Sequence, residues 1–153
     1  MRALIQRVKE SSVSVNGSVH GSIGRGMLIF LGVRNEDTIG DAQYLAQRCA
    51  DLRIFEDEHD KMNLSIKDIS GEALVISQFT LYADTRRGNR PSFTDAAQPE
   101  IAKKLYDSFV QYLCEEIGID KVRSGIFRSM MDVQLVNDGP VTVQVESKEK
   151  NKI

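Results

Sequence analysis

The sequence contains few residues that could hold a metal ion or act as a catalytic base. Its two histidines, His20 and His59, lie in polar stretches typical of turns, and no Cys-x-x-Cys or His-x-x-x-His spacing occurs. A Ser-His-Asp triad would need one of these histidines as its base, and neither lies near a nucleophile elbow. The sequence therefore predicts no metal site and no cofactor, and it disfavours a triad.

Long apolar runs are also absent. No run approaches the roughly 20 residues needed to cross a bilayer, and the first segment, MRALIQRVKE, alternates and carries charges instead of forming a signal peptide. Cys49 and Cys114 fall inside helical patterns and not in a close pair, so we expect two buried free thiols. Together these features predict a cytoplasmic protein that does not engage a membrane.

Positive charge is not in excess over the whole chain, whose formal net charge is −2. The chain as a whole is therefore not a polycation for nucleic acid. Locally, DTRRGNRPSF carries Arg86, Arg87 and Arg90, and this loop is either solvated surface or a contact for phosphate. We predict that residues 1–147 form one domain and that 148–153 form a basic, flexible tail.

Alternating apolar residues in the first third predict strands over RALIQRVKE, SVSV and the segment after Asn16-Gly17, a pair typical of a two-residue hairpin. GMLIFLGV is a continuous apolar run, which predicts a strand buried on both faces. The glycines of GSIGRGM precede this strand and do not open a helix, so the P-loop and dinucleotide-binding interpretations fail.

Two segments switch to a helical period. In the first, Thr38 and Asp41 resemble a capping pair, and the apolar face comprises Ala42, Leu45, Ala46, Cys49 and Leu52. In the second, Pro99 suits the first turn and Gly118 the C-terminal cap. Its inner side is predicted to carry Ile101, Leu105, Phe109, Tyr112 or Leu113, and Glu116 or Ile117.

Further short strands are predicted at RIFED, ALVISQF, KVRSGIF, DVQLV and VTVQV, giving the order ββββ-α-ββ-α-βββ. Strands thus come in runs with two inserted helices. This order predicts a single-domain α+β fold, with a mostly antiparallel, β-barrel-like sheet and two main helices.

The stretch SQFTL places polar residues where the buried strand ALVI ends. One interpretation is an ordinary strand end. The other is that consecutive backbone N–H groups leave the sheet and point into a cleft, where they could stabilise an oxyanion without a titrating side chain. Thr80 could also act as a nucleophile, but its hydroxyl would need a base, and none lies nearby in the sequence.

A second unusual stretch, LVNDGPVTVQV, joins two alternating runs through residues 137–140. These letters alone predict a hairpin turn with a trans peptide bond, because X-Pro bonds are cis in only about 5–6% of folded cases. Pro140 would then begin the last strand, where a missing N–H donor is tolerated.

Taken together, SQFTL at 77–81 and NDGPVT at 137–142 resemble the two signature motifs of the D-aminoacyl-tRNA deacylases, also named D-Tyr-tRNA deacylases. The resemblance covers nearly the whole chain, and neither motif departs from the family pattern. Five further stretches fall in the expected order: LIQRV at 4–8, RIFED at 53–57, KMNLS at 61–65, RGNRPSF at 87–93 and LYD at 105–107.

This resemblance implies a metal-free homodimer that hydrolyses the ester between a D-amino acid and the terminal adenosine of tRNA, and that also removes glycine from mischarged tRNA. Gly139-Pro140 would form a cis bond that enters the other subunit's pocket, where two backbone carbonyls would exclude an L side chain. Arg7 would pin this element. Taken alone, Arg7 would be a surface residue on an edge strand.

The resemblance also implies roles around the ester. The predicted catalytic residues are Gln78, Phe79 and Thr80, of which Phe79 and Thr80 would offer backbone N–H groups to the carbonyl oxygen. Ser77 would line the pocket. Phe127 and Met131 would pack around the adenine, although their own sequence context fits core residues equally well.

Several alternatives remain open at this stage. Substrate-assisted attack by water is preferred over a Thr80 acyl-enzyme, because the ester is already activated and the ribose 2′-hydroxyl can help deprotonate water. A non-catalytic RNA-binding module that uses the arginine loop is the main alternative function. A general hydrolase of small esters is another.

Overall fold

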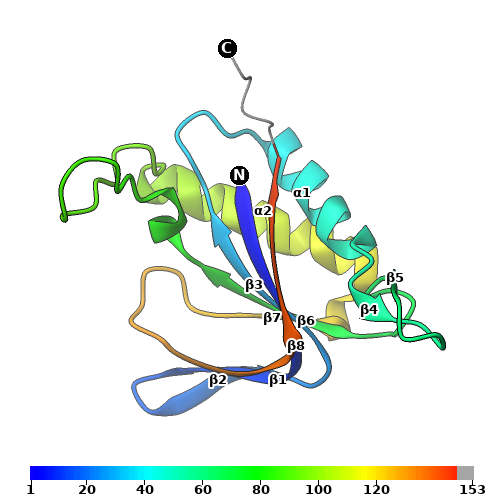
Figure 1. Ribbon diagram of the computed structural model, residues 1–153. Coiled ribbons are helices and arrows are strands. Elements are labelled where there is room, and N and C mark those ends of the chain that lie inside the picture. Colours follow the sequence, from blue (N-terminus) through cyan, green and yellow to red (C-terminus); the bar gives the residue numbers. More distant parts are fainter. Residues whose placement is uncertain (148–153) are drawn as a thin grey trace.

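Two long strands, β1 (Arg2–Val15) and β8 (Asp132–Glu146), lie side by side over almost their whole length (Figure 1). Among the described strands β8 pairs with β1 alone and forms an edge of the sheet. The computed structural model describes residues 1–147, and in it the two strands run antiparallel. Their register shifts near Val8, where β8 passes through residues 137–141. Both strands curve strongly, which gives the sheet its barrel-like form.

The other edge of β1 is shared by two strands. Its second half pairs with β2 (Ser18–Ile23) and its first half with β3 (Gly26–Gly32), both antiparallel. Beyond β3 follow β6 (Glu72–Ser77) and β7 (Val122–Ser124), each parallel to its neighbour because a helix-containing crossover precedes it. Pairing is therefore mixed, and the predicted barrel-like α+β fold is confirmed.

The strand boundaries correct two predictions. RALIQRVKE and SVSV form the single strand β1, and DVQLV and VTVQV form the single strand β8. Gly139-Pro140 therefore does not turn a hairpin, because β8 stays paired with β1 on both sides of it and the register shift absorbs the irregularity. The hairpin at Asn16-Gly17 is confirmed, and both residues have the positive φ, 50° and 80°, that such a turn requires.

Two helices, α1 (Ile39–Asp51) and α2 (Pro99–Ile117), pack against each other on one face of the sheet (Figure 1). The predicted capping box is present, since the Thr38 N–H donates to the Asp41 carboxylate over 2.8 Å. Pro99 lies in the first turn of α2 and Gly118, with φ 105°, caps its end, both as predicted. Within residues 1–147, neither helix is long and apolar enough to cross a membrane.

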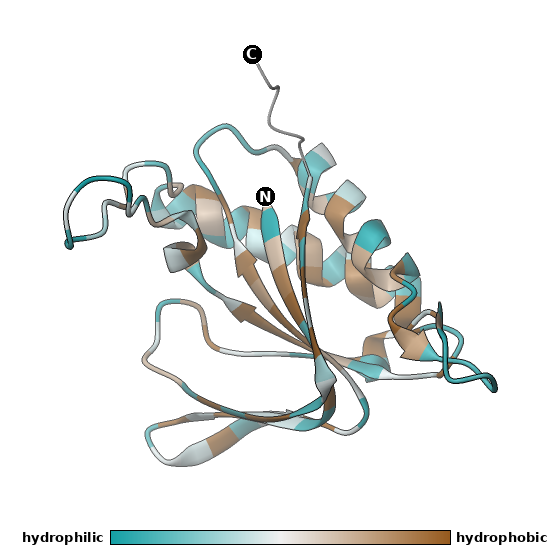
Figure 2. Cartoon of the chain, viewed as in Figure 1, coloured by the Kyte–Doolittle hydropathy of each residue, from teal (hydrophilic) through white to brown (hydrophobic). Residues whose placement is uncertain are grey.

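Hydrophobic residues fill two cores, and Figure 2 shows them on the strands and on the sheet-facing sides of the helices. The larger core lies between helices and sheet and includes the predicted α1 residues Ala42, Leu45, Ala46 and Cys49, while Leu52 follows the helix end and is half-buried. The smaller core lies within the curl of the sheet and comprises Val8, Val13, Ile23, Leu28, Leu74 and Ile76.

Two burial predictions need correction. Ile101 is 48% exposed, because the first turn of α2 directs Pro99 and Ala102 toward a hollow beside the sheet and leaves Ile101 facing outward. Cys114 is a free thiol but only half-buried, whereas Cys49 is free and fully buried. Burial raises the pKa of the Cys49 thiol to about 12, so this thiol is inert.

The remaining elements are short. A two-stranded sheet of β4 (Phe55–Glu56) and β5 (Met62–Leu64) follows α1, and the 3₁₀ turns η1 (Phe79–Tyr82) and η2 (Ile119–Lys121) precede and follow α2. SQFTL is thus not the continuation of a strand, because β6 ends at Ser77 and the chain then coils into η1. The predicted tail at 148–153 lies outside the described residues.

Candidate functional site

The strand β6 passes into the turn η1 at an abrupt change of backbone direction. The Gln78 N–H makes the last bond to β3, donating to the Leu31 carbonyl over 2.8 Å. The chain then coils, and the N–H groups of Leu81 and Ala83 donate back to the carbonyls of Gln78 and Thr80 over 3.3 and 3.0 Å. This turn presents the backbone of Phe79 and Thr80 at the surface.

Two adjacent N–H groups are left without acceptors at this point. Within residues 1–147, the N–H groups of Phe79 and Thr80 make no hydrogen bond, as is usual for the first residues of a helical turn. Phe79 is 56% exposed, and Thr80 is exposed as well. The turn therefore offers a pair of neighbouring donors that could bind a carbonyl oxygen or an anion.

The Thr80 hydroxyl has an amide as its neighbour and not a base. The Gln78 side-chain amide donates a hydrogen bond to the Thr80 Oγ1. Among the described residues, no histidine, carboxylate or amine contacts this hydroxyl. Such an environment does not remove the hydroxyl proton, so Thr80 is not set up as a nucleophile in the free chain.

A hollow of about 640 Å³ opens beside the turn. It lies between the end of β6, the start of α2 and the loop before β8. Five residues predicted from the sequence line it: Ser77, Gln78, Phe79, Phe127 and Met131. Phe93, which was not predicted, lines it too, with its ring edge-on to Phe79 at a centroid distance of 5.1 Å.

The far wall of the hollow is held by contacts with the core. Phe127 packs against Tyr106 with ring centroids 5.9 Å apart, and the Tyr106 hydroxyl donates to the Val75 carbonyl of β6 over 2.8 Å. Met131 packs closely against Gly125, where a Cβ would stand only 2.6 Å from the Met131 sulfur, so a side chain at this position would displace Met131. Phe127 and Met131 are half-buried and face the hollow.

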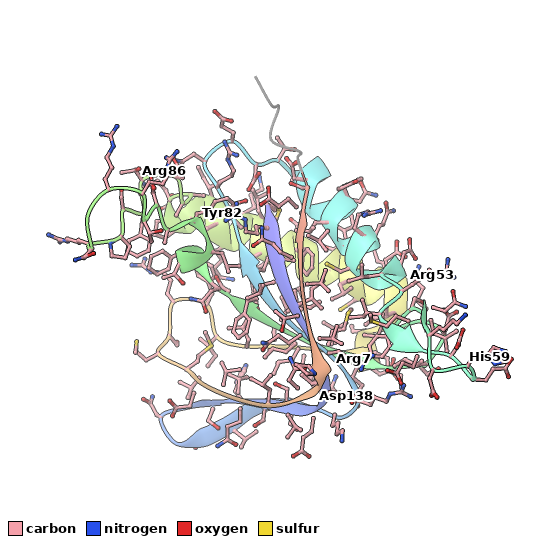
Figure 3. The ribbon with its side chains drawn as sticks, in the orientation of Figure 1. Arg7, Arg53, His59, Tyr82, Arg86 and Asp138 are labelled. Carbon is pink, nitrogen blue, oxygen red and sulfur yellow. The ribbon has the colours of Figure 1, made fainter. Side chains whose placement is uncertain are left out.

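Arg7 holds the segment before Gly139 at a different place on the sheet. Its guanidinium is almost completely buried, and it donates to the carbonyls of Asp138 over 2.7 Å and Ile54 over 2.8 Å. The carboxylates of Asp138 and Glu56 lie 3.6 and 3.7 Å away. Figure 3 shows Arg7 beside Asp138. The interpretation of Arg7 as a surface residue is therefore wrong, because its side chain is buried among these three residues.

The Gly139-Pro140 bond is cis, as the resemblance implies and in contrast to the trans bond that the letters alone predict. The Asn137 side chain closes the segment, accepting from the Val141 N–H over 2.8 Å and donating to its carbonyl over 3.2 Å. Gly139 has φ 152°, and a Cβ there would lie 2.7 Å from the Val141 nitrogen. Both Gly139 and Pro140 are exposed.

The two motifs do not meet within one chain. Neither Gly139 nor Pro140 lines the hollow beside η1. In the sheet register, Arg7 pairs with Met27, whereas the turn begins beside Leu31, four residues further along β3 and thus roughly 13 Å away. In Figure 3, Arg7 and Asp138 lie together at one place on the sheet, and Tyr82, which ends the turn, lies at another.

Arg2 also supports the turn, and sequence analysis did not identify this residue. Its guanidinium donates to the Leu81 carbonyl over 2.6 Å and to the Glu146 carboxylate over 2.8 Å, and it lies 4.8 Å from the centre of the Tyr82 ring. Burial raises the pKa of Tyr82 above its ordinary value, so this ring stays neutral. These partners are distant in the chain, which is why alternation along β1 could not reveal the role.

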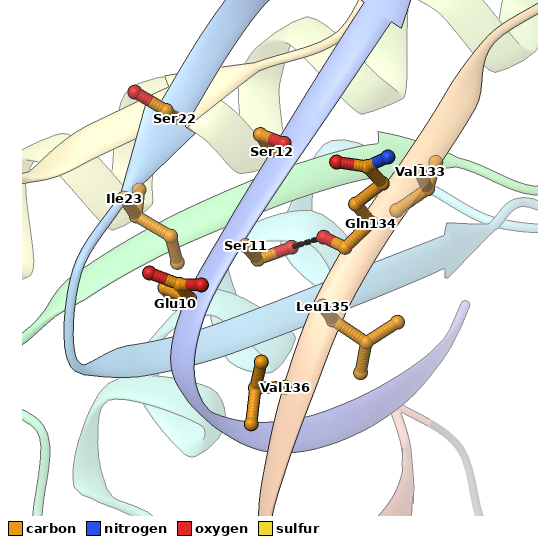
Figure 4. Close-up of a pocket in the computed structure, with 9 residues that line it drawn as sticks. All are labelled: Glu10, Ser11, Ser12, Ser22, Ile23, Val133, Gln134, Leu135 and Val136. Carbon is orange, nitrogen blue, oxygen red and sulfur yellow. Dashed lines mark hydrogen bonds between the residues drawn. The ribbon is translucent and has the colours of Figure 1, made fainter.

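We also searched the rest of the described chain for a metal site and for a second hollow. Within residues 1–147, no three His, Cys, Asp or Glu side chains gather in a way that could hold a metal ion. A hollow of about 750 Å³ lies between β1, β2 and β8 (Figure 4), and none of the predicted site residues lines it. Its single titratable group is Glu10, and its Ser11 hydroxyl donates to the Gln134 carbonyl over 2.7 Å.

Sequence comparisons connect the chain to one group of proteins. Residues 4–146 match the model of the family described as D-Tyr-tRNA(Tyr) deacylase. The D-aminoacyl-tRNA deacylase of Desulfatibacillum aliphaticivorans is 55% identical over 148 residues, which cover 97% of this chain and 100% of the relative. That of Roseiflexus castenholzii is 58% identical over 147 residues, covering 96% of this chain and 92% of the relative.

Solved structures agree in fold. A protein described as "c-Myc DNA Unwinding Element Binding Protein" superposes with a TM-score of 0.93 at 38% identity, over 97% of this chain and 100% of that one. A probable eukaryotic D-amino acid tRNA deacylase superposes with a TM-score of 0.83, over 95% of this chain and 98% of that one. The second pair is only 16% identical, so this likeness concerns the fold alone.

The contacts of Arg2 predict a local effect on the turn. In Arg2→Gln the Leu81 carbonyl loses its charged donor, and such hydrogen bonds are worth about 1.5–3 kcal/mol. We expect the Leu81 and Ala83 amides to exchange with solvent roughly tenfold faster, as measured by hydrogen–deuterium exchange. Arg34→Gln, which removes a surface ion pair with Glu36, is the control. Unchanged exchange in Arg2→Gln would show that the turn does not depend on this contact.

Proposed function

The chain belongs to the D-Tyr-tRNA(Tyr) deacylase family, and we propose that it hydrolyses the ester bond of D-aminoacyl-tRNA in the cytoplasm, releasing the D-amino acid and free tRNA. The observation that carries this proposal is the pair of unbonded N–H groups at Phe79 and Thr80 beside a hollow lined with aromatic residues. This arrangement suits an ester that is already activated, because it supplies electrostatic stabilisation without a titrating side chain.

In the proposed complex the aminoacyl ester lies against η1. Its carbonyl oxygen accepts hydrogen bonds from the Phe79 and Thr80 N–H groups, and these bonds strengthen as negative charge develops on that oxygen. The terminal adenine packs between Phe127 and Met131, since an unpaired base is bound by stacking on aromatic and apolar side chains. Ser77 and Gln78 line the space around the amino acid.

We further propose that water, and not Thr80, attacks the ester. The Thr80 hydroxyl accepts a hydrogen bond from Gln78 and has no base beside it among the described residues. The ribose 2′-hydroxyl lies next to the ester in the substrate. It can position the water, take up the proton of the attacking water and pass its own proton to the neighbouring ribose oxygen that leaves. The protein then needs only to orient the ester and to stabilise the oxyanion.

Selection between D and L substrates is proposed to come from a second copy of the chain. Gly139 and Pro140 are exposed and lie far from the chain's own hollow, so a homodimer related by a two-fold axis would bring them to the partner's hollow. There their backbone carbonyls would occupy the space of an L side chain. A D side chain would point away, and glycine, which has no side chain, would pass, so glycyl-tRNA is a further proposed substrate.

The first prediction concerns handedness. The chain should release D-tyrosine from D-tyrosyl-tRNA and leave L-tyrosyl-tRNA intact, because exclusion by rigid backbone is insensitive to rotamer changes. Release of labelled tyrosine from the two charged tRNAs measures this. Equal rates on both would refute selection by handedness.

The same assay separates the alternative functions. A non-catalytic RNA-binding module would bind either tRNA and leave the ester intact, and a general small-ester hydrolase would cleave free aminoacyl esters equally well.

The second prediction separates water attack from an acyl-enzyme. Thr80→Val keeps the backbone N–H and removes the hydroxyl, so the rate on D-tyrosyl-tRNA should stay within a few-fold of the original. Phe79→Pro removes one N–H donor at a position where proline fits a helical turn, and it should lower kcat about 10²–10³-fold. Single-turnover hydrolysis measures both. Loss of nearly all activity in Thr80→Val, with normal tRNA binding, would instead support Thr80 as nucleophile.

A further inference from the structure

A hairpin-like loop projects from the body of the protein directly after η1 (Figures 1 and 3). Its base is closed by two backbone hydrogen bonds between Asp84 and Ser92, over 2.7 and 3.0 Å. The residues at 86–91 form the tip, which carries three arginines and no acidic residue. Gly88 at the tip has φ 66°, a left-handed conformation that glycine adopts without strain.

One of the three arginines is used to hold the loop. The Arg86 guanidinium donates to both oxygens of the Asp84 carboxylate, over 2.9 and 2.7 Å, and the Arg86 N–H donates to the same group over 3.0 Å. These hydrogen bonds from Arg86 hold the pKa of the Asp84 carboxyl below its usual value. The charge of Arg86 is thus balanced within the loop.

The other two arginines have no bonding partner among the described residues. Arg87 and Arg90 are exposed, and within residues 1–147 neither makes a hydrogen bond or an ion pair. Asp84 is occupied by Arg86, and Asp95, beyond the base of the loop, lies close enough to interact with Arg86 as well. The tip therefore presents two positive charges without counter-ions, on a loop whose base is closed by hydrogen bonds.

The loop is tied to the proposed site at its base. Ser92 is followed by Phe93, which lines the hollow and packs edge-on against Phe79. Arg87 lies three residues from Asp84 and Arg90 two residues from Ser92, so both stand within about 10 Å of the base of the loop. A nucleic-acid strand that enters the hollow would pass this loop with its neighbouring phosphates.

We propose that Arg87 and Arg90 form a phosphate-binding site for the strand that leads into the hollow, an inference that rests on the proposed function. The esterified nucleotide is connected to the rest of its tRNA through phosphodiesters, and the planar guanidinium with its paired donors matches phosphate oxygens. Arg86 preorganises the loop and does not itself contact the strand. The site would add affinity for tRNA that an isolated aminoacyl nucleoside cannot use.

The experiment compares two esters, D-tyrosyl-tRNA and D-tyrosyl-adenosine, which carries no phosphate. In Arg87→Ala/Arg90→Ala, kcat/KM for the tRNA should fall roughly tenfold at low salt, while kcat/KM for the nucleoside ester stays unchanged. The slope of log kcat/KM against log salt should become shallower by about 1.4–1.8, because each lost phosphate contact removes about 0.7–0.9. The loop is exposed, so these changes leave the fold intact, which thermal unfolding verifies.

Two control variants are matched to this test. Lys103→Gln/Asp107→Asn removes one charge of each sign from an exposed ion pair on α2 and should leave the salt slope unchanged. Arg48→Ala removes an exposed cation from α1 and should leave kcat/KM unchanged for both esters. An unchanged salt slope in Arg87→Ala/Arg90→Ala, or an equal loss on both esters, would overturn the phosphate site.

The experiment distinguishes failure of the proposed function from failure of the phosphate site. If the unaltered protein cleaves neither ester, the proposed function fails, and the phosphate site is then tested by binding of uncharged tRNA, measured by fluorescence anisotropy over the same salt range. A shallower salt dependence in the double variant supports the site without catalysis. An unchanged dependence refutes it.

Discussion

The buried guanidinium of Arg7 fixes the one segment on which the arrangement of the proposed site depends. It joins β1 to the carbonyls of Ile54 and Asp138, and two carboxylates flank it. Removing a partner from a buried charge of this kind costs several kcal/mol, so the bend in β8 has little freedom to move. Asn137 closes the same bend from the other side, and Gly139 and Pro140 are held outward as a result.

This constraint makes the single chain an incomplete unit in the proposed account. The hollow beside η1 has donors and aromatic walls, while the Gly139-Pro140 segment, which is proposed to distinguish a D from an L amino acid, stands elsewhere and is exposed. In a two-fold dimer, the Gly139-Pro140 segment of each copy would enter the hollow of its partner. One type of contact would then cover the exposed segment and complete the hollow in both copies. Arg2, on the same strand as Arg7, supports the turn, so β1 would carry the supports of both halves.

Much of this could be predicted from the sequence, for identifiable reasons. The helix caps at Thr38, Pro99 and Gly118 depend on local chemistry, and they were predicted correctly. The residues expected around the ester and the adenine do line one hollow, with the exception of Thr80: Ser77, Gln78, Phe79, Phe127 and Met131. Long-range partners were beyond reach: Arg2 contacts residues 81 and 146, and β8 continues through a proline because β1 pairs with it on both sides.

Mixing two inactive variants tests the shared site most directly. Phe79→Pro damages the hollow. Gly139→Val distorts the projecting segment, where a side chain does not fit, and in a shared site the distorted segment would obstruct the partner's hollow and block hydrolysis there. If the site is built from two chains, subunit exchange between them yields mixed dimers with one intact site, and about a quarter of the original activity on D-tyrosyl-tRNA should return. If each chain completes its own site, the mixture will stay as inactive as its components, and that result would contradict the account.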